Sequence, residues 1–86
     1  MHYKYECKMT CSRFIEFDLV DNVVHNIVFF GGCNGNLKAV AKLCEGKTVE
    51  YIESTLKGNT CGFKPTSCAD QLAIAVREAY DKTRTN

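Results

Sequence analysis

An alternation of apolar and polar residues is the clearest pattern in the first third of the chain. Ile15, Phe17 and Leu19 are separated by acidic residues, and this period of two is typical of a half-buried β-strand. A shorter strand is expected before it, over residues 4–11, and His2 is expected in a flexible end. The pattern therefore predicts that the chain begins with β-structure.

A hairpin is expected next, because Asp21-Asn22 is a turn signal and an apolar run follows it at residues 23–30. A two-residue loop would place on the face shared with Ile15 the residues Val24, Asn26, Val28 and Phe30. A three-residue loop with a bulge would place there Val23, His25, Ile27 and Phe29. The second set is more apolar apart from its histidine, which is expected to be at or near the surface. Both registers fit the pattern.

Helical spacing begins after the glycines at 31 and 32, which end the strand. Asn34 or Asn36 can cap this helix, whose core-facing stripe is Leu37, Val40, Ala41 and Cys44. A second, shorter helix is expected to start after Thr48 and to stop at Gly58, with the inward residues Val49, Ile52 and Leu56.

The last helix begins with a capping box, since Ser67 is followed three residues later by Asp70. Its apolar positions at helical spacing are Leu72, Ala73, Val76, Ala79 and Tyr80. Cys68 is then the first helical residue, where unpaired N–H groups and the helix dipole favour an anion, so that a thiol loses its proton more easily. Residues 82–86 are expected to fray.

Strands followed by helices predict one α+β domain over residues 1–86, with an antiparallel three-stranded sheet and three helices packed on one face. Such a sheet has edges to cover, and a homodimer through one edge is expected.

The formal net charge is +1, from 11 basic and 10 acidic residues, which argues against nucleic acid or an anionic membrane as partner. Apolar runs such as Ile27–Phe30 are too short to span a bilayer. The first residues lack a signal-peptide core, so a cytoplasmic protein is expected.

Six cysteines are unusual for 86 residues. Without an export signal they indicate metal binding, thiol redox chemistry or reduced core residues. Cys44 lies on the core stripe and is interpreted as core. Four others are expected at the ends of elements, where proteins gather ligands for soft metals: Cys11, Cys33, Cys61 and Cys68. Their spacing is not that of a zinc ribbon.

Three strings of residues resemble the TSCPD-domain family: 31–37 (GGCNGNL), Cys61-Gly62 and 66–73 (TSCADQLA). The resemblance runs from about Tyr5 to Tyr80. The family's proline within the last motif is Ala69 here, a change that should leave the chemistry intact. The cysteines that match the pattern are Cys11, Cys33, Cys61 and Cys68, whereas the other two, Cys7 and Cys44, are interpreted as structural.

That resemblance implies a link to ribonucleotide reductase, because the family includes small bacterial proteins and a C-terminal region of the cobalamin-dependent enzymes. The chain is too short for the barrel that nucleotide reduction needs, so it would be an accessory part rather than an enzyme alone. A looser resemblance is to the U-type iron–sulfur scaffold proteins. It implies Cys11, Cys33 and Cys68 as ligands of zinc or a nascent cluster, with Ser67 where the scaffold has a histidine.

Three functions are compatible with these observations. In the first, the four matching cysteines hold zinc or an iron–sulfur cluster, and Asp70 is either a pure helix cap or an acceptor behind the ligands. In the second, two cysteines form a reversible dithiol that serves a ribonucleoside-diphosphate reductase, although no Cys-x-x-Cys motif is present. In the third, the chain is a non-catalytic interaction module with a reduced core.

Overall fold

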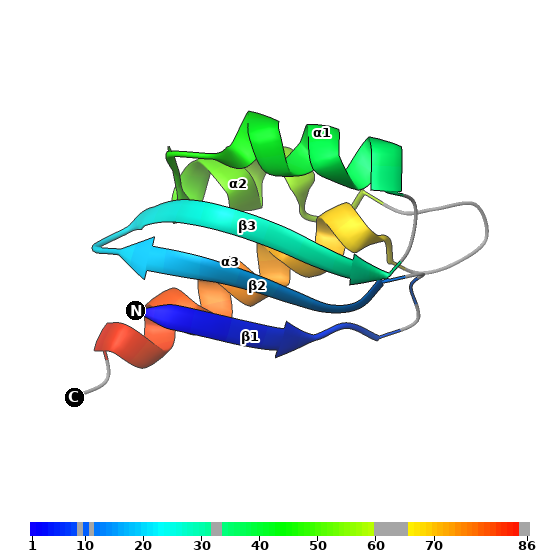
Figure 1. The fold of residues 1–86 in the computed structure, drawn as a ribbon. Coiled ribbons are helices and arrows are strands. Elements are labelled where there is room, and N and C mark those ends of the chain that lie inside the picture. The colour runs from blue at the N-terminus through cyan, green and yellow to red at the C-terminus, as the bar shows by residue number, and fades with distance from the viewer. Residues whose placement is uncertain (9, 11, 32–33, 60–65, 85–86) are drawn as a thin grey trace.

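The computed structural model of the chain describes residues 1–8, 10, 12–31, 34–59 and 66–84. The described elements are, in chain order, β1 (His2–Glu6), β2 (Ser12–Val20), β3 (Val23–Gly31), α1 (Asn34–Cys44), β4 (Lys47–Thr48), α2 (Val49–Leu56) and α3 (Cys68–Arg84). The expected α+β class, with an antiparallel sheet and three helices, is confirmed for this part of the chain (Figure 1).

The sheet of the described residues has four strands in the order β1-β2-β3-β4, so the expected three-stranded sheet is one strand short. The missed strand, β4, consists of two residues that pair with the start of β3, Val23 with Thr48 and Val24 with Lys47. The Gly46 N–H also donates to the Val24 carbonyl at 2.8 Å. Two residues are too few for any period to appear in the sequence.

The hairpin of β2 and β3 combines the two expected registers. Next to the turn, Val20 pairs with Val23, as a two-residue loop requires, and buried Val24 lies opposite buried Leu19. A register shift then follows at Asn26, which has a φ of 56°. An extra residue at a β-bulge reverses which face the side chains occupy. Beyond it, the inward-facing residues are therefore those of the bulged register, Ile27 and Phe29.

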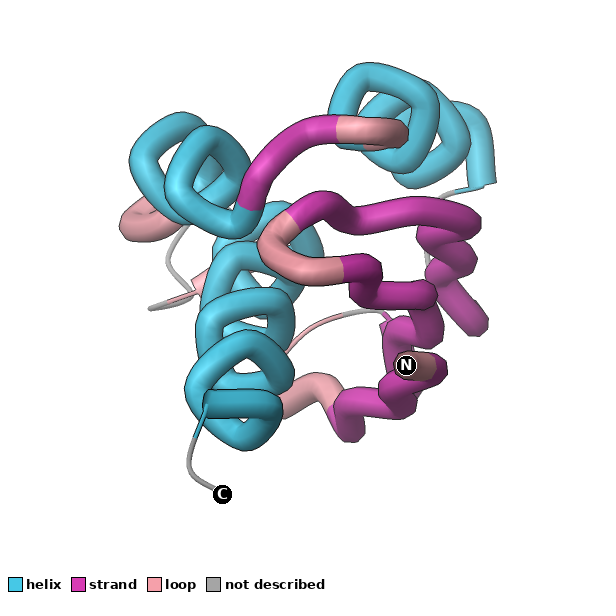
Figure 2. Tube along the Cα trace, turned by 90° about the vertical axis from the view of Figure 1, so that its left-hand side faces the viewer, coloured by secondary structure: helices cyan, strands magenta, loops and turns pink. Residues whose placement is uncertain are grey.

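The core lies between one face of the sheet and the helices. Figure 2 shows α3 and α2 on this face, while α1 lies alongside β3. The fully buried side chains include Ile15 and Phe17 from β2 and Val76 from α3. Cys44 is 4% exposed and belongs to the core, as its stripe predicts. No helix of the described residues covers the opposite face, where the Phe14 and Phe30 rings lie 4.6 Å apart.

Both ends of the described chain are more ordered than the sequence suggests. His2 is part of β1, not of a flexible end, and its ring nitrogens contact Asp18 Oδ1 at 2.9 Å and Glu16 Oε1 at 2.7 Å. At the other end, α3 continues through Lys82 to Arg84. Lys82 lies over the Tyr3 ring, with 5.2 Å from its nitrogen to the ring centroid. Contacts with β1 therefore support the last turn of the helix.

The start of α2 follows the expected cap, whereas Asn36, one of the two caps expected for the preceding helix, lies inside α1. Thr48 caps α2, and its hydroxyl accepts a hydrogen bond from the Tyr51 N–H at 3.1 Å. Within the described residues, no helix is both long and apolar enough to cross a membrane.

Candidate functional site

Cys68 is the first residue of α3, as the sequence predicts. The Ser67 carbonyl accepts the N–H of Gln71 at 2.8 Å, and the Ser67 hydroxyl accepts the N–H of Asp70 at 3.1 Å. These bonds make Ser67 the N-cap of the helix. The thiol of Cys68 therefore lies at the positive end of a 17-residue helix, where negative charge is favoured.

Ser12 brings the start of β2 to this thiol. Its hydroxyl donates a hydrogen bond to Cys68 Sγ at 3.0 Å, although the two residues are 56 positions apart. Ser12 is 3% exposed, while Cys68 is half-buried. A hydroxyl that donates to sulfur stabilises a thiolate over a thiol. The pair therefore joins two distant segments and favours negative charge at the same atom.

The carboxylate of Asp70 accepts hydrogen bonds from other groups than the capping box predicts. It accepts the N–H of Gly58 at 2.6 Å and the hydroxyl of Thr66, while Gln71 Nε2 donates to the same Thr66 hydroxyl at 3.0 Å. All buried side-chain nitrogens and oxygens among the described residues have a hydrogen-bond partner. This buried cluster fixes the end of α2 against the start of α3.

A second bond at the same place holds the chain after α2. The Ser67 hydroxyl donates to the carbonyl of Asn59, and the Asn59 N–H donates to Leu56 at 3.1 Å. Asn59 and Thr66 are the described residues on either side of positions 60–65. The two ends of the connection from α2 to α3 are therefore held next to Cys68.

Of the expected metal ligands, only Cys68 can be placed. Cys11, Cys33 and Cys61 lie outside the described residues. Their described neighbours are all at one end of the molecule: Ser12 contacts Cys68 and pairs with Gly31 in the sheet, and Asn59 contacts Ser67. No group of three or more His, Cys, Asp or Glu side chains within the described residues is arranged to hold a metal ion.

Cys7 is a neighbour of Cys68 that the sequence did not single out. Its N–H donates to the Arg13 carbonyl at 2.9 Å, and the half-buried side chain packs against the core. Burial first, and then the charge of Cys68, raise the pKa of Cys7 to about 11, while a hydrogen bond with Thr10 opposes the rise. The signal available in the sequence is alternation, since Tyr3, Tyr5 and Cys7 share the face turned toward the core.

The other described candidates are not brought to this site. Cys44 is buried in the core, and desolvation raises the pKa of its thiol. His25 is at the surface, where its Nδ1 lies 2.8 Å from Glu45 Oε2. Neither residue therefore belongs to the cluster around Cys68.

Comparison with known proteins gives one match. A family model described as the TSCPD domain matches residues 1–80. No curated protein and no solved structure matches the chain.

Proposed function

Because the chain belongs to the TSCPD-domain family, we propose that it is a small module that binds zinc or an iron–sulfur cluster through convergent thiolates. The proposed ligands are Cys11, Cys33, Cys61 and Cys68. Thiolate sulfur is the donor that both kinds of centre prefer. The metal would join segments that lie far apart in the sequence and so stabilise a small core.

The hydrogen bond from Ser12 to Cys68 Sγ is the observation that carries this proposal. Ser12 directly follows Cys11 in the chain, and its sheet partner Gly31 is two residues before Cys33. The contact of Ser67 with Asn59, two residues before Cys61, adds the fourth segment. Consecutive Cα atoms are about 3.8 Å apart, so each proposed ligand is within a short reach of a described residue at this end.

The electrostatics at Cys68 also fit a metal ligand. A ligating cysteine must be a thiolate, and the helix start and the Ser12 hydroxyl both favour that form. Asp70 fits a supporting role rather than a ligand role, because its carboxylate already accepts hydrogen bonds from Gly58 and Thr66. We assign it to holding the helix start in place.

The proposed biological role is that of an accessory part. The family resemblance favours an association with ribonucleotide reductase, in which the module would act on or beside a larger protein. A cavity of about 400 Å³ between α2 and α3 is lined by side chains that include the ion-paired Arg77 and Glu53. That ion pair joins the two helices, which favours a structural role for this cavity.

Metal analysis of protein purified without oxygen tests the proposal. We expect about one zinc ion per chain, or the visible absorption of a cluster after reconstitution with iron and sulfide. Cys68→Ser should remove most of the bound metal, whereas Cys44→Ala, in the core, should retain it. A metal-free protein after reconstitution with zinc and with iron and sulfide, or equal metal content in both variants, would overturn the proposal.

A further inference from the structure

The second thiol near Cys68 among the described residues is that of Cys7, which the family pattern leaves out. We propose that Cys7 and Cys68 form a dithiol that reduces disulfides by thiol–disulfide exchange. The consequence for the metal rests on the proposed function: oxidation of this pair would remove Cys68 from the ligand set. The dithiol itself does not depend on a metal.

Three backbone and side-chain contacts bring the two cysteines into one neighbourhood. Cys7 donates its N–H to Arg13, whose chain neighbour Ser12 contacts Cys68 Sγ at 3.0 Å. The residue after Cys7, Lys8, donates its N–H to Gln71 Oε1 at 3.1 Å, and Gln71 lies one helical turn beyond Cys68. The end of β1 is therefore fixed against the first turn of α3.

The side chains of Cys7 and Cys68 are placed and exposed in a way that suits thiol–disulfide exchange. Tyr3, Tyr5 and Cys7 form a row on the face of β1 that packs against the core, and α3 lies behind that face (Figure 1). Cys7 ends this row beside Arg13, the residue after the Ser12 that contacts Cys68 Sγ. Both cysteines are half-buried rather than enclosed, and a disulfide substrate can therefore reach them.

The surroundings of the two cysteines give them different roles in the exchange. The helix start and the Ser12 hydroxyl favour the thiolate of Cys68, which makes it the attacking sulfur. Cys7 lies on the face of β1 that packs against the core, and we assign it the second step, the attack on Cys68 Sγ.

The exchange balances without a cofactor. The Cys68 thiolate attacks one sulfur of the substrate disulfide, the S–S bond breaks, and the first substrate thiolate leaves. Cys7 loses its proton and attacks Cys68 Sγ, which expels the second substrate thiolate. Two electrons pass from the two cysteines to the substrate, whose thiolates take up protons. The products are two substrate thiols and one Cys7–Cys68 disulfide.

Oxidised glutathione is a suitable probe, because trypsin separates the relevant cysteines. Cleavage after Lys4, Lys8 and Arg13 places Cys7 and Cys11 in different peptides. Cys68 shares its tryptic peptide with Cys61, so the experiment uses the Cys61→Ser variant, reduced, stripped of metal and then treated with the probe. Mass spectrometry should find the peptide of Cys7 linked to that of Cys68.

The Cys7→Ser change, added to this background, should stop the reaction halfway, with one glutathione retained on Cys68 per chain. Cys7→Ala is the parallel variant if the serine perturbs folding, and far-UV circular dichroism checks both. Cys44→Ala is the matched control and should still give the linked product. A Cys68 disulfide to Cys11 or Cys33 in place of Cys7, or full release of glutathione without Cys7, would overturn the proposal.

The experiment separates this proposal from the metal site. A linked product from a chain that never binds metal would support the dithiol and count only against the metal. Zinc binding without any Cys7–Cys68 product would leave the metal site in place and overturn the dithiol. If both hold, prior loading of the native chain with zinc should slow its reaction with oxidised glutathione at least tenfold, because the metal occupies the attacking sulfur.

Discussion

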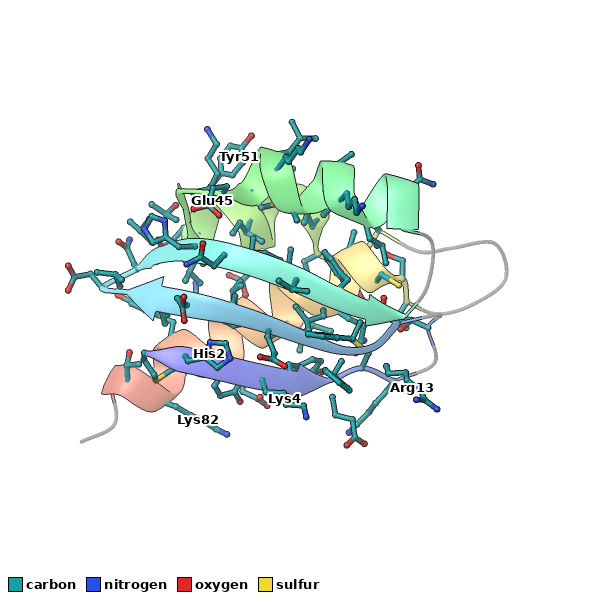
Figure 3. All side chains as sticks on the ribbon, in the orientation of Figure 1. His2, Lys4, Arg13, Glu45, Tyr51 and Lys82 are labelled. Carbon is teal, nitrogen blue, oxygen red and sulfur yellow. The ribbon has the colours of Figure 1, made fainter. Side chains whose placement is uncertain are left out.

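The imidazole of His2 lies on the open face of the sheet, where two carboxylates of β2 flank it (Figure 3). The hydrogen bond with Asp18 and then that with Glu16 raise the pKa of His2 above 6.5. Conversely, Asn26 first and His2 second lower the pKa of Asp18 below 3.8. The contact therefore stabilises the fold most between these two ordinary values, with His2 protonated and Asp18 ionised.

This arrangement predicts a pH-dependent attachment of β1. A raised pKa means that the contribution of His2 is complete below pH 6.5 and is lost as the pH rises through the folded-state value. We expect His2→Gln to lower the free energy of unfolding more at about pH 5.5 than at about pH 9. Urea unfolding at both pH values measures the difference.

The control for this prediction is a titration of the imidazole by NMR. In Asp18→Asn the midpoint of His2 should move down toward 6.5, because its largest partner has lost its charge. An unchanged midpoint, or an equal loss of stability at both pH values, would contradict the interpretation.

The candidate site was predictable at Cys68 but not at its partners. A capping sequence fixes where a helix begins, so the position of this cysteine follows from neighbouring residues. The contacts of Ser12 and Cys7 depend instead on how β1 and β2 pack against α3, which no local pattern contains. Asp70 illustrates the same limit, since its expected local bond is replaced by bonds to Gly58 and Thr66.

At the scale of elements, the N-cap residues of α2 and α3 differ in the hydrogen bonds that they make. Thr48 is half-buried and its hydroxyl accepts one hydrogen bond, from the Tyr51 N–H. Ser67 is 9% exposed, accepts the Asp70 N–H and also donates to the carbonyl of Asn59. The cap of α3 therefore also connects two helices, whereas the cap of α2 serves one helix end.

This contrast predicts that replacing each N-cap residue with alanine lowers the unfolding free energy by a different amount. Ser67→Ala should cost about 2 kcal/mol of unfolding free energy, the upper end of the usual range for an N-cap, because the Asn59 carbonyl also loses its partner. Thr48→Ala should cost about 1 kcal/mol or less. Denaturant unfolding of both variants provides the comparison, and equal costs would show that the bond to Asn59 contributes nothing.

The elements themselves follow well from the sequence, except where tertiary contacts decide. The periods of β2 and of the three helices are visible because each buries a regular row of side chains. The strand β4 is defined by its pairing with β3 alone, and the register of the hairpin changes at the left-handed residue Asn26. A bulge of this kind satisfies both halves of the hairpin, so neither uniform register could be correct.

The whole molecule is a two-layer domain with one face of its sheet uncovered by the described helices (Figure 2). A domain of this size buries about two-thirds of the surface of its unfolded chain, which leaves its stability modest. The proposed metal would act on this global balance, because a ligand that binds only the folded chain adds its binding free energy to folding.

We therefore expect metal removal to lower the unfolding temperature. At a free zinc concentration about 100 times the dissociation constant, the added free energy is about 2.7 kcal/mol, which corresponds to roughly 10–20 °C for a domain of this size. Thermal unfolding with and without a chelator measures it. Cys44→Ala should keep the shift and Cys68→Ser should lose it; a chelator that leaves the native chain unchanged would contradict the expectation.

The course of α3 has one practical consequence for the whole molecule. The helix starts at the thiol and runs for 17 residues, about 25 Å, to the end of the molecule where β1 also begins (Figure 1). A fluorophore, an affinity handle or a fusion partner attached at either terminus would thus be remote from Cys68. The domain can be tethered to a solid support by either end with Cys68 at the opposite end of the molecule.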